Sequence, residues 1–364
     1  MTATMAVAVC LPLTYALGLN HGLALLLGLY VGAFPVAWCR QCCSTFPARH
    51  RRSLPLSTAF PWPRKARANV LRVCVVASVI GGLISAIVLF LFAPLLAEFS
   101  IKFSYVEKFL IILLALTVIA SMSRNMLVGI FSGVIGIWLS LIGTYSISDG
   151  GNGKTRLMFD FLEPYLFEGF SLLPVLIGIF GIATILLEAE EGIKSGLASQ
   201  NIKFGKGGGF SFGIFRGRLT NLVRSSFIGT FVGMLPGVGG SAASVLAYTQ
   251  EKNLSRDSSE MGKGAPQGLM ASESANNALT GGALIPLLSL GIPGDSTTAV
   301  LIGAFTLQGI QVGPLFIPEN ADTWYVMMTA LVFANIVMFF LMFYAIKHIA
   351  KVVLVPSTSS IRSS

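Results

Sequence analysis

Long apolar runs separated by short polar segments repeat along almost the whole chain. Several of them approach or exceed the roughly 20 mostly apolar residues that a helix needs to cross a bilayer. These runs are 75–99, 109–122, 126–147, 170–187 and 324–346, and two further apolar stretches, 1–19 and 22–33, precede them. The run at 1–19 needs no signal peptide to explain it, because similar runs follow throughout. The pattern predicts an all-α, polytopic transmembrane helical bundle.

The composition supports a membrane environment. Apolar residues make up 54% of the 364 positions and charged residues 11%. The mean hydropathy is +0.77, which lies outside the range of soluble globular domains. We therefore expect a multi-pass protein whose main surroundings are the lipid bilayer.

The formal net charge of +9 is concentrated in one window, residues 34–74. This window contains no acid but eight basic residues: Arg40, Arg49, Arg51, Arg52, Arg64, Lys65, Arg67 and Arg72. It also holds Cys39, Cys42, Cys43 and Cys74. A basic loop is one interpretation and a zinc site with His50 is another, but the adjacent Cys42 and Cys43 do not form the paired spacing of structural zinc sites. A nucleic-acid partner is not expected, because the remainder of the chain is nearly balanced in charge.

A second basic segment, 188–224, contains six Lys or Arg residues and the flexible stretch 205–209. The positive-inside rule places such a loop in the cytoplasm. It divides a first membrane region, 1–187, from a second, 225–356, and leaves 357–364 as an irregular tail. The GGNGKT stretch at 150–155 lacks the first glycine of a phosphate-binding loop, and no strand is expected before it, so we interpret it as a loop between spans.

In residues 225–319, Gly, Pro, Asn, Ser and Thr interrupt sequence that is otherwise apolar enough to span a membrane. Backbone that is broken at membrane depth is tolerated where protein or a watery cavity satisfies its polar groups. Discontinuous helices of this kind mark substrate and ion sites in secondary transporters, although Gly and Pro also permit kinks and close helix packing. Two interrupted segments, LPGVGG at 235–240 and GIPGDST at 291–297, together with Asn276 and Asn277, indicate a site with broken or re-entrant helices.

These segments resemble a known signature. LPGVGG at 235–240, SANNALTGGALIP at 274–286 and LGIPG at 290–294 are similar to motifs in the large membrane subunit of the tripartite tricarboxylate transporter family, the TctA-type proteins. The resemblance extends from the first residue to about Pro356, apart from the window at 34–74. Gln267 and Ser272 stand where relatives usually carry Glu and Pro, and Asp295 stands where a small residue is usual.

The resemblance implies a helical protein with two related halves in the bacterial inner membrane. It also implies two partners, a small membrane subunit and a periplasmic solute-binding protein that delivers a di- or tricarboxylate such as citrate. Uptake would be driven by a Na⁺ or proton gradient, with no other cofactor and no metal. Comparison with the family further suggests that an opening span with a first LPG-type motif is missing before Met1, and that several spans are missing after Pro356.

The expected substrate site lies at the interrupted helices. N-termini of half-helices attract anions through free N–H groups and the helix dipole, glycines let the backbone approach closely, and amides can bind a carboxylate or a cation. A helix–helix hydrogen bond is the alternative role for the two asparagines, and Glu273 is a candidate for cation or proton binding or for a solvent-facing position. The predicted substrate-binding residues are Pro236, Gly237, Gly239, Asn276, Asn277, Gly281, Gly282, Pro293, Gly294, Ser296 and Thr297.

Two other classes of function were weighed. A membrane-embedded enzyme would need a nucleophile–base pair or metal ligands, yet His21, His50 and His348 are the only histidines and none lies in a catalytic motif. The chain is therefore expected not to be an enzyme. A non-transporting structural or receptor subunit is the third possibility, and an assay of carboxylate movement into vesicles separates it from a transporter.

Residues 34–74 are interpreted as an out-of-frame reading. If the reading frame is shifted by one nucleotide, the first two bases of each codon as read are the last two bases of the intended codon. Under this shift, the codon of Trp62 is compatible with an intended Met, that of His50 with Pro and that of Thr58 with Asp. Residues 42–52 then permit VLLNIPGTPSS and residues 58–66 permit DGFPMAxKG, which match the family's first-half counterpart of the GIPG region. No function is therefore assigned to Cys39, His50 or Arg51.

We predict that the chain as written does not transport, because basic residues near the bilayer centre cost roughly 2.5 to 3.5 kcal/mol each. Resequencing the gene tests the frame argument. An intact frame encoding NIPGTP would reveal an error in the sequence, whereas a true frameshift would indicate a decayed gene. Uptake by a chain that is verified to contain CCSTFPARHRR would contradict both the frame argument and the two-half site.

Overall fold

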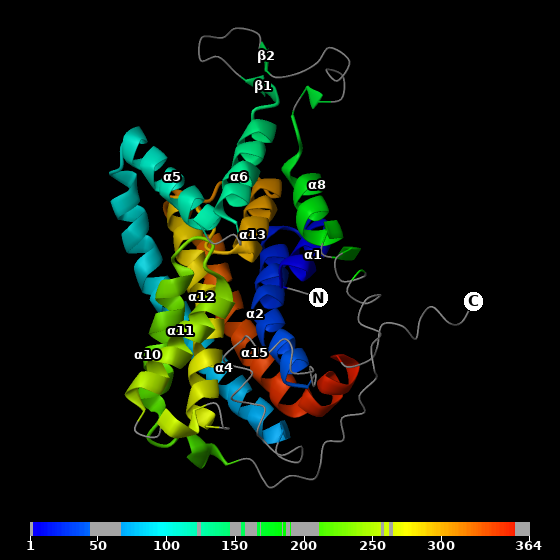
Figure 1. Cartoon of the computed structure of the whole chain (residues 1–364). Helices are drawn as coiled ribbons and strands as arrows, with labels where there is room; N and C mark the ends of the chain where they lie inside the picture. The colour runs from blue at the N-terminus through cyan, green and yellow to red at the C-terminus, as the bar shows by residue number, and fades with distance from the viewer. Residues whose placement is uncertain are drawn as a thin grey trace, which may run out of the picture.

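The computed structural model describes residues 3–43, 67–121, 125–145, 154–156, 166–167, 169–183, 185–186, 190, 211–255, 258–261 and 265–353. The helices of these residues form an all-α bundle with one short ribbon of two strands (Figure 1). The longer helices are α1 (Ala3–Leu17), α2 (Leu19–Cys43), α4 (Arg67–Ile101), α5 (Tyr105–Ser121), α6 (Met126–Ser140), α10 (Leu219–Gly233), α11 (Gly239–Leu254), α12 (Pro266–Leu290), α13 (Ser296–Leu307) and α15 (Ala321–Val353). The shorter elements are β1 (Gly143–Tyr145), β2 (Lys154–Arg156), α8 (Leu172–Leu176), η4 (Ile177–Ile182), η5 (Phe212–Phe215), η6 (Ser258–Glu260) and α14 (Phe316–Glu319).

The predicted all-α bundle is confirmed, and most apolar runs of the sequence correspond to helices. Two of the described helices, with segments Leu71–Ile101 and Ala321–Ala345, are long and apolar enough to cross a membrane. Helix α6 is apolar and none of its residues is buried, and α5 buries only Ala115 and Ala120. Such apolar, exposed helices are characteristic of proteins that face lipid or another apolar partner.

Two of the apolar runs form shorter α-helices than their lengths led us to expect. The run 126–147 stays helical only to Ser140, because Gly143 adopts φ +127 and residues 143–145 pair with β2 in an antiparallel ribbon. The run 170–187 gives the short helix α8 followed by the wider turns of η4, which contains Gly178 and Gly181; glycine tolerates such departures from α-helical geometry. Helix α10 begins at Leu219, inside the basic segment 188–224.

The ribbon also changes the interpretation of GGNGKT. A strand, β1, does precede this stretch, contrary to expectation. Lys154 and Thr155 lie inside β2, which is antiparallel to β1. A phosphate-binding loop needs its Lys and Thr at the start of a helix, so the geometry of these two residues differs from that of such a loop.

The window at 34–74 is described only in part. Helix α2 continues into it as far as Cys43 and α4 begins inside it at Arg67, but residues 44–66 lie outside the described part of the chain, as does the tail at 357–364. Cys74 is a buried free thiol. No group of three or more His, Cys, Asp or Glu side chains that could hold a metal ion occurs among the residues that the structure describes.

Helix α12 is the centre of the bundle, and it contacts both α4 and α10 along much of its length (Figure 1). Nearly all of its residues are buried. Glycines make the close contacts possible: a Cβ atom on Gly81 of α4 would overlap the carbonyl group of Ser274, and one on Gly229 of α10 would overlap that of Ala275. Small residues at such positions let transmembrane helices pack backbone to backbone.

Two glycines of α12 itself make further close contacts with α4 and α10. A Cβ on Gly281 would lie 2.6 Å from the Ser85 hydroxyl of α4, and a Cβ on Gly282 would overlap the Thr230 carbonyl of α10. Residue numbers rise together along these contacts, so α4, α10 and α12 run parallel. Gly281 and Gly282, which the sequence placed in the substrate site, are therefore packing residues in this structure.

We predict that Gly282→Ala destabilises the protein by about 1 to 3 kcal/mol, because the added methyl group must displace backbone. Gly136→Ala is the matched control: Gly136 lies in α6 with nothing within 4 Å of its would-be Cβ, so Ala should be neutral or stabilise by up to about 1 kcal/mol through its higher helix propensity. Thermal unfolding of the detergent-solubilised variants measures both effects. Equal stability of the two variants would contradict the packing model.

Candidate functional site at two broken helices

Helices α10 and α11 form a hairpin whose tip carries the LPGVGG motif. Helix α10 has 15 residues and α11 has 16, so at 1.5 Å per residue each is about 22 to 24 Å long. This is shorter than the hydrocarbon core of a bilayer, which is about 30 Å thick. The chain reverses at Gly237 and Gly239, which have φ +80 and +71, and glycine is the residue that adopts this left-handed conformation at least cost.

The second break separates α12 from α13. Helix α12 ends at Leu290 and is closed by Gly291, whose φ is +74 and whose N–H donates to the carbonyl oxygen of Leu287. The N–H of Ile292 donates to the carbonyl oxygen of Pro286 over 3.2 Å. This pair of bonds satisfies the last carbonyl groups of the helix. The chain then passes through Pro293 and Gly294 into α13.

The two breaks meet through their backbones. The N–H of Gly237 at the hairpin tip donates to the carbonyl oxygen of Gly294 over 2.8 Å. Gly294 is buried between the hairpin and α12: a Cβ there would lie 2.6 Å from the Gly233 carbonyl oxygen and 2.7 Å from Cα of Ala283. Two motifs that are more than 50 residues apart in sequence are thereby joined at one place.

The N-terminus of α13 already holds a carboxylate of the chain. Asp295 is the N-cap residue, and its Oδ1 accepts the backbone N–H of Thr298 over 2.7 Å. The Thr298 hydroxyl in turn accepts the backbone N–H of Asp295, which completes a capping box. The other oxygen, Oδ2, accepts the Tyr30 hydroxyl of α2 over 2.8 Å. An incoming anion at this helix terminus therefore has to compete with Asp295.

The neighbouring hydroxyl groups differ in exposure. Thr297 is buried, and its hydroxyl lies 3.0 Å from that of Thr4 in α1. Ser296 is exposed at the start of α13. Of these two predicted site residues, only Ser296 presents its hydroxyl to the outside of the bundle.

The two predicted asparagines have different surroundings. Asn277 is fully buried, and its amide group donates to the backbone carbonyl of Ser78 in α4 over 2.8 Å and to Oδ1 of Asn335 in α15 over 2.9 Å. This is the helix–helix hydrogen bonding that the sequence left open as an alternative. Asn276 is half-buried, and it remains the more accessible amide of the pair.

The predicted residues thus separate into two groups. Seven of them gather at the two breaks: Pro236, Gly237, Gly239, Pro293, Gly294, Ser296 and Thr297. Gly294 contacts Ala283 of α12. Asn277 precedes Ala283 in this helix by about six residues, or roughly 9 Å. Three residues near these groups were not predicted: Tyr30, Ser78 and Asn335. Of these, Asn335 has a signal in the sequence, because it is a lone amide in an apolar run.

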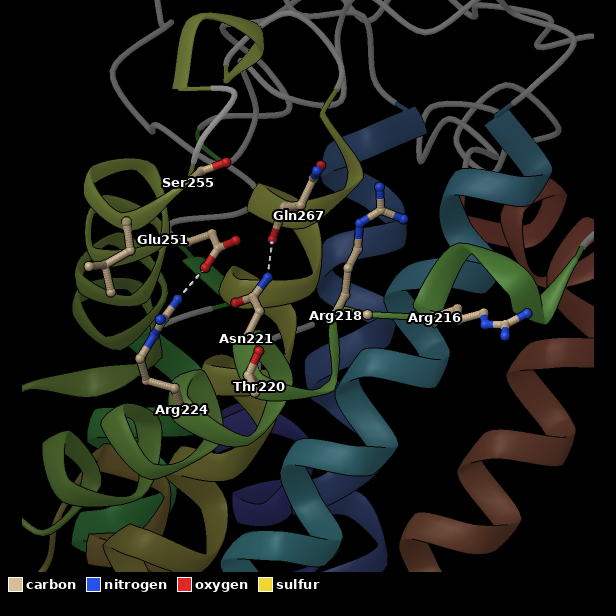
Figure 2. A pocket seen from close by; sticks show the side chains of 10 residues that line it. Arg216, Arg218, Thr220, Asn221, Arg224, Glu251, Ser255 and Gln267 are labelled. Carbon is tan, nitrogen blue, oxygen red and sulfur yellow. Dashed lines mark hydrogen bonds and ion pairs between the residues drawn. The ribbon is translucent and has the colours of Figure 1, made fainter.

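A polar pocket lies at the opposite end of the hairpin, where α10 begins, α11 ends and α12 begins (Figure 2). It has a volume of about 380 Å³ and is lined by Arg216, Gly217, Arg218, Thr220, Asn221, Arg224, Glu251, Leu254, Ser255 and Gln267. Arg224 forms an ion pair with Glu251, and Arg218 donates to the carbonyl oxygen of Ile214. The pocket therefore belongs to a basic end of the bundle.

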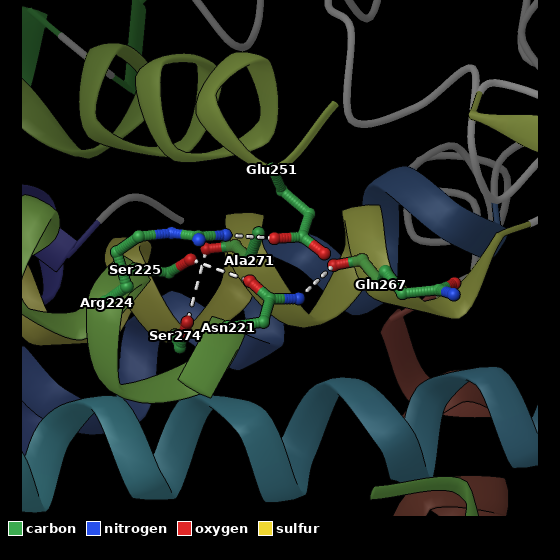
Figure 3. A network of polar contacts seen from close by, with 7 residues as sticks. All are labelled: Asn221, Arg224, Ser225, Glu251, Gln267, Ala271 and Ser274. Atoms are coloured by element: carbon green, nitrogen blue, oxygen red, sulfur yellow. Dashed lines mark hydrogen bonds and ion pairs between the residues drawn. The ribbon is translucent and has the colours of Figure 1, made fainter. Parts of the chain in front are cut away.

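Polar contacts tie the three helices together beside this pocket (Figure 3). Nδ2 of Asn221 donates to the backbone carbonyl of Gln267 over 3.0 Å, and the hydroxyl of Ser225 donates to Oδ1 of Asn221 over 3.0 Å. The hydroxyl of Ser274 bonds within α12, to the carbonyl oxygen of Ala271. The start of α12 is thus fixed to α10 by side chains, whereas its middle is fixed by glycine contacts.

Comparison with known proteins agrees with the signature motifs. Residues 1–360 match the tripartite tricarboxylate transporter TctA family, and the chain belongs to this family. An Agrobacterium vitis protein described as an uncharacterized 52.8 kDa protein in the TAR-I ttuC′ 3′ region is 32% identical over 316 residues, which cover 85% of this chain and 61% of that protein. The chain thus spans about three fifths of the length of this relative.

A second Agrobacterium vitis protein, described as an uncharacterized protein in the TAR-II ttuC′ 3′ region, is 50% identical over 86 residues. The match covers 24% of this chain and 36% of that protein. No solved structure matches the chain. The family assignment therefore rests on sequence, and the arrangement of the two breaks comes from the structure described above.

We predict that Asp295→Ala destabilises the chain by about 0.5 to 2 kcal/mol through loss of the N-cap, with a further loss from the Tyr30 hydrogen bond. Asp295→Asn is the matched control, because Asn caps helices as well as Asp does but carries no charge. Thermal unfolding of both variants tests the cap. If the Asn variant were as unstable as the Ala variant, the charge of Asp295 would matter more than its hydrogen-bond geometry.

Proposed function

We propose that this chain is the large membrane subunit of a binding-protein-dependent secondary transporter that imports a di- or tricarboxylate of the citrate type. The observation that carries the proposal is the meeting of two broken helices at the Gly237–Gly294 hydrogen bond. Broken helices that meet inside a bundle expose backbone N–H and C=O groups to a shared space, which is the arrangement of substrate and ion sites in secondary transporters. Membership of the TctA family supports the same class of function.

The substrate is proposed to bind on the outer side of the two breaks. Backbone at the hairpin tip and the Ser296 hydroxyl offer hydrogen-bond donors there. The carboxylate of Asp295 repels like charge, so we expect the substrate's carboxylates to bind nearer to the start of α11 than to the start of α13. Helix α11 begins with Gly239 and has no side-chain cap, so its first N–H groups are open to an anion.

The chain is proposed to sit in the bacterial inner membrane with the pocket end of the hairpin in the cytoplasm. Arg216, Arg218 and Arg224 lie at that end, and cytoplasmic ends of membrane helices carry an excess of Arg and Lys. The exposed apolar helices α5 and α6 support placement in a bilayer. A small membrane subunit and a periplasmic solute-binding protein are the proposed partners.

The proposed energy source is a Na⁺ or proton gradient. In vesicles that contain a full-length, frame-restored version of this chain with its two partner subunits, we expect labelled citrate or a related carboxylate to accumulate when an ion gradient is imposed, and accumulation to continue after ATP is removed. A structural or receptor subunit would bind its partners without moving substrate. An enzyme would convert the substrate chemically. Accumulation that requires internal ATP with the gradients collapsed would rule out the proposed mechanism.

We predict that Gly294→Ala lowers this uptake by roughly 5- to 150-fold, the equivalent of about 1 to 3 kcal/mol of strain, because its methyl group separates the two breaks. Gly32→Ala is the matched control, since nothing lies within 4 Å of its would-be Cβ. Immunoblots of the membrane fraction establish that both variants are present in equal amounts. Normal uptake by the Gly294 variant would show that the contact between the breaks is not needed.

A further inference from the structure

Three buried side-chain oxygen atoms of α12 lack hydrogen-bond partners among the described residues: Oε1 of Gln267 at the pocket, and Oε1 of Glu273 and Oδ1 of Asn277 deeper in the bundle. The Glu273 side chain is 2% exposed and that of Asn277 is 0% exposed. An unpartnered buried acceptor costs free energy, and an isolated buried carboxylate costs far more. The two deeper atoms, in the most buried helix of the bundle, require a physical explanation.

The two atoms belong to side chains on the same face of α12. Residues four apart on a helix have Cβ atoms about 5 to 6 Å from each other, so the Glu273 carboxyl group can reach the Asn277 side chain. The donors around Asn277 are already in use. Its own amide donates to Ser78 and Asn335, and Nδ2 of Asn335 donates to the carbonyl oxygen of Leu331. The side chains of Glu273, Asn277 and Asn335 therefore contain more hydrogen-bond acceptors than available donors, and one additional donor is needed.

A single proton supplies that donor. Protonation converts the Glu273 carboxylate into a carboxylic acid, removes its buried charge, and creates an O–H group that can donate to Oδ1 of Asn277. One event thereby satisfies both unpartnered oxygens. A metal cation would need several converging oxygen ligands, but the Ser78 and Asn335 oxygens beside Asn277 already accept its amide protons.

The charged and titratable groups on neighbouring helices have different surroundings. Cys74 of α4 is a buried free thiol. The Arg72 guanidinium of the same helix lies 5.3 Å from the ring centre of Phe343, and its Nε is buried without a hydrogen-bond partner among the described residues. Arg224 of α10 is paired with Glu251 of α11 beside Ala271 (Figure 3); at 100° per residue, Ala271 lies on the opposite face of α12 from Glu273. On α2, Tyr30 is bonded to Asp295.

We propose that Glu273 is the proton-binding group of this protein and that Asn277 is its hydrogen-bond acceptor. The proposal rests on the proposed transport function: the carboxylate takes up one proton from one side of the membrane, and the carboxylic acid releases it on the other. Asn277 links this event to the bundle, because its amide joins α12 to α4 and α15. Glu273 lies between the cytoplasmic pocket, which Gln267 of α12 lines, and the two breaks.

Infrared difference spectroscopy of the purified full chain tests protonation without transport. We expect a carboxylic-acid C=O stretching band at neutral pH that disappears in Glu273→Gln and moves to higher frequency in Asn277→Ala, which removes the acceptor. Glu251→Gln is the matched control, because that carboxylate forms an ion pair with Arg224, and it should leave the band unchanged. The Asn277 variant keeps the test informative if Glu273→Gln does not fold.

Uptake in vesicles tests coupling. An imposed pH gradient should drive accumulation by the full-length, frame-restored chain, and Glu273→Gln in that chain should lose this gradient-dependent part while it still exchanges labelled for unlabelled carboxylate. Absence of the band, its persistence in Glu273→Gln, or its removal by NaCl but not by choline chloride would overturn the proposal whether or not the complex transports. Accumulation that depends on Na⁺ and not on pH would overturn proton coupling while leaving the transport function intact.

Discussion

Backbone-to-backbone contact along α12 is the constraint on which the rest of the structure depends. Gly81 and Gly229 bring α4 and α10 against its two sides, and Gly281 and Gly282 accept them. In a membrane, the hydrophobic effect does not drive helices together, so close van der Waals contact has to do so. The Asn277 hydrogen bonds and the meeting of the two breaks both require these short distances between helices.

The same contacts explain why the site has so few charged side chains. A Cβ on Gly82 would overlap the side chains of Asn277 and Asn335, so the space beside α12 admits an amide pair and little else. At the breaks the polar groups are mainly backbone, and the carboxylate present there, Asp295, accepts hydrogen bonds from a helix N-terminus and a tyrosine hydroxyl. Partial charges of the backbone thus carry the electrostatics of the site.

Much of the fold could be predicted from the sequence, because apolar length and Gly-Pro interruptions are local signals. Both breaks were located from LPGVGG and GIPGDST. The roles of Gly281 and Gly282 could not be predicted, since a glycine that contacts a ligand and one that contacts a neighbouring helix look the same in a sequence. The early end of the helix at Ser140 depends on pairing with residues 154–156, which no local pattern in the apolar run indicates.

The candidate site was less accessible to sequence reasoning than the fold. Asp295 was noticed as an unusual residue, but its cap depends on Thr298 and its second bond on Tyr30, 265 residues away in sequence. Asn277 was expected to bind ligand or to join helices, and the partners that favour the second role lie on α4 and α15. Such long-range partners become visible only when the helices are placed in space.

The shortness of the α10–α11 hairpin has an electrical consequence. A hairpin about 22 Å deep does not reach across a bilayer core of about 30 Å, so water above its tip would bring the outside solution into the membrane. In the proposed membrane placement, the membrane voltage would then fall across a layer thinner than the bilayer, and the field at the Gly237–Gly294 contact would be correspondingly stronger. Each elementary charge that crosses this layer still gains about 2.3 kcal/mol per 100 mV, but it does so over a shorter path.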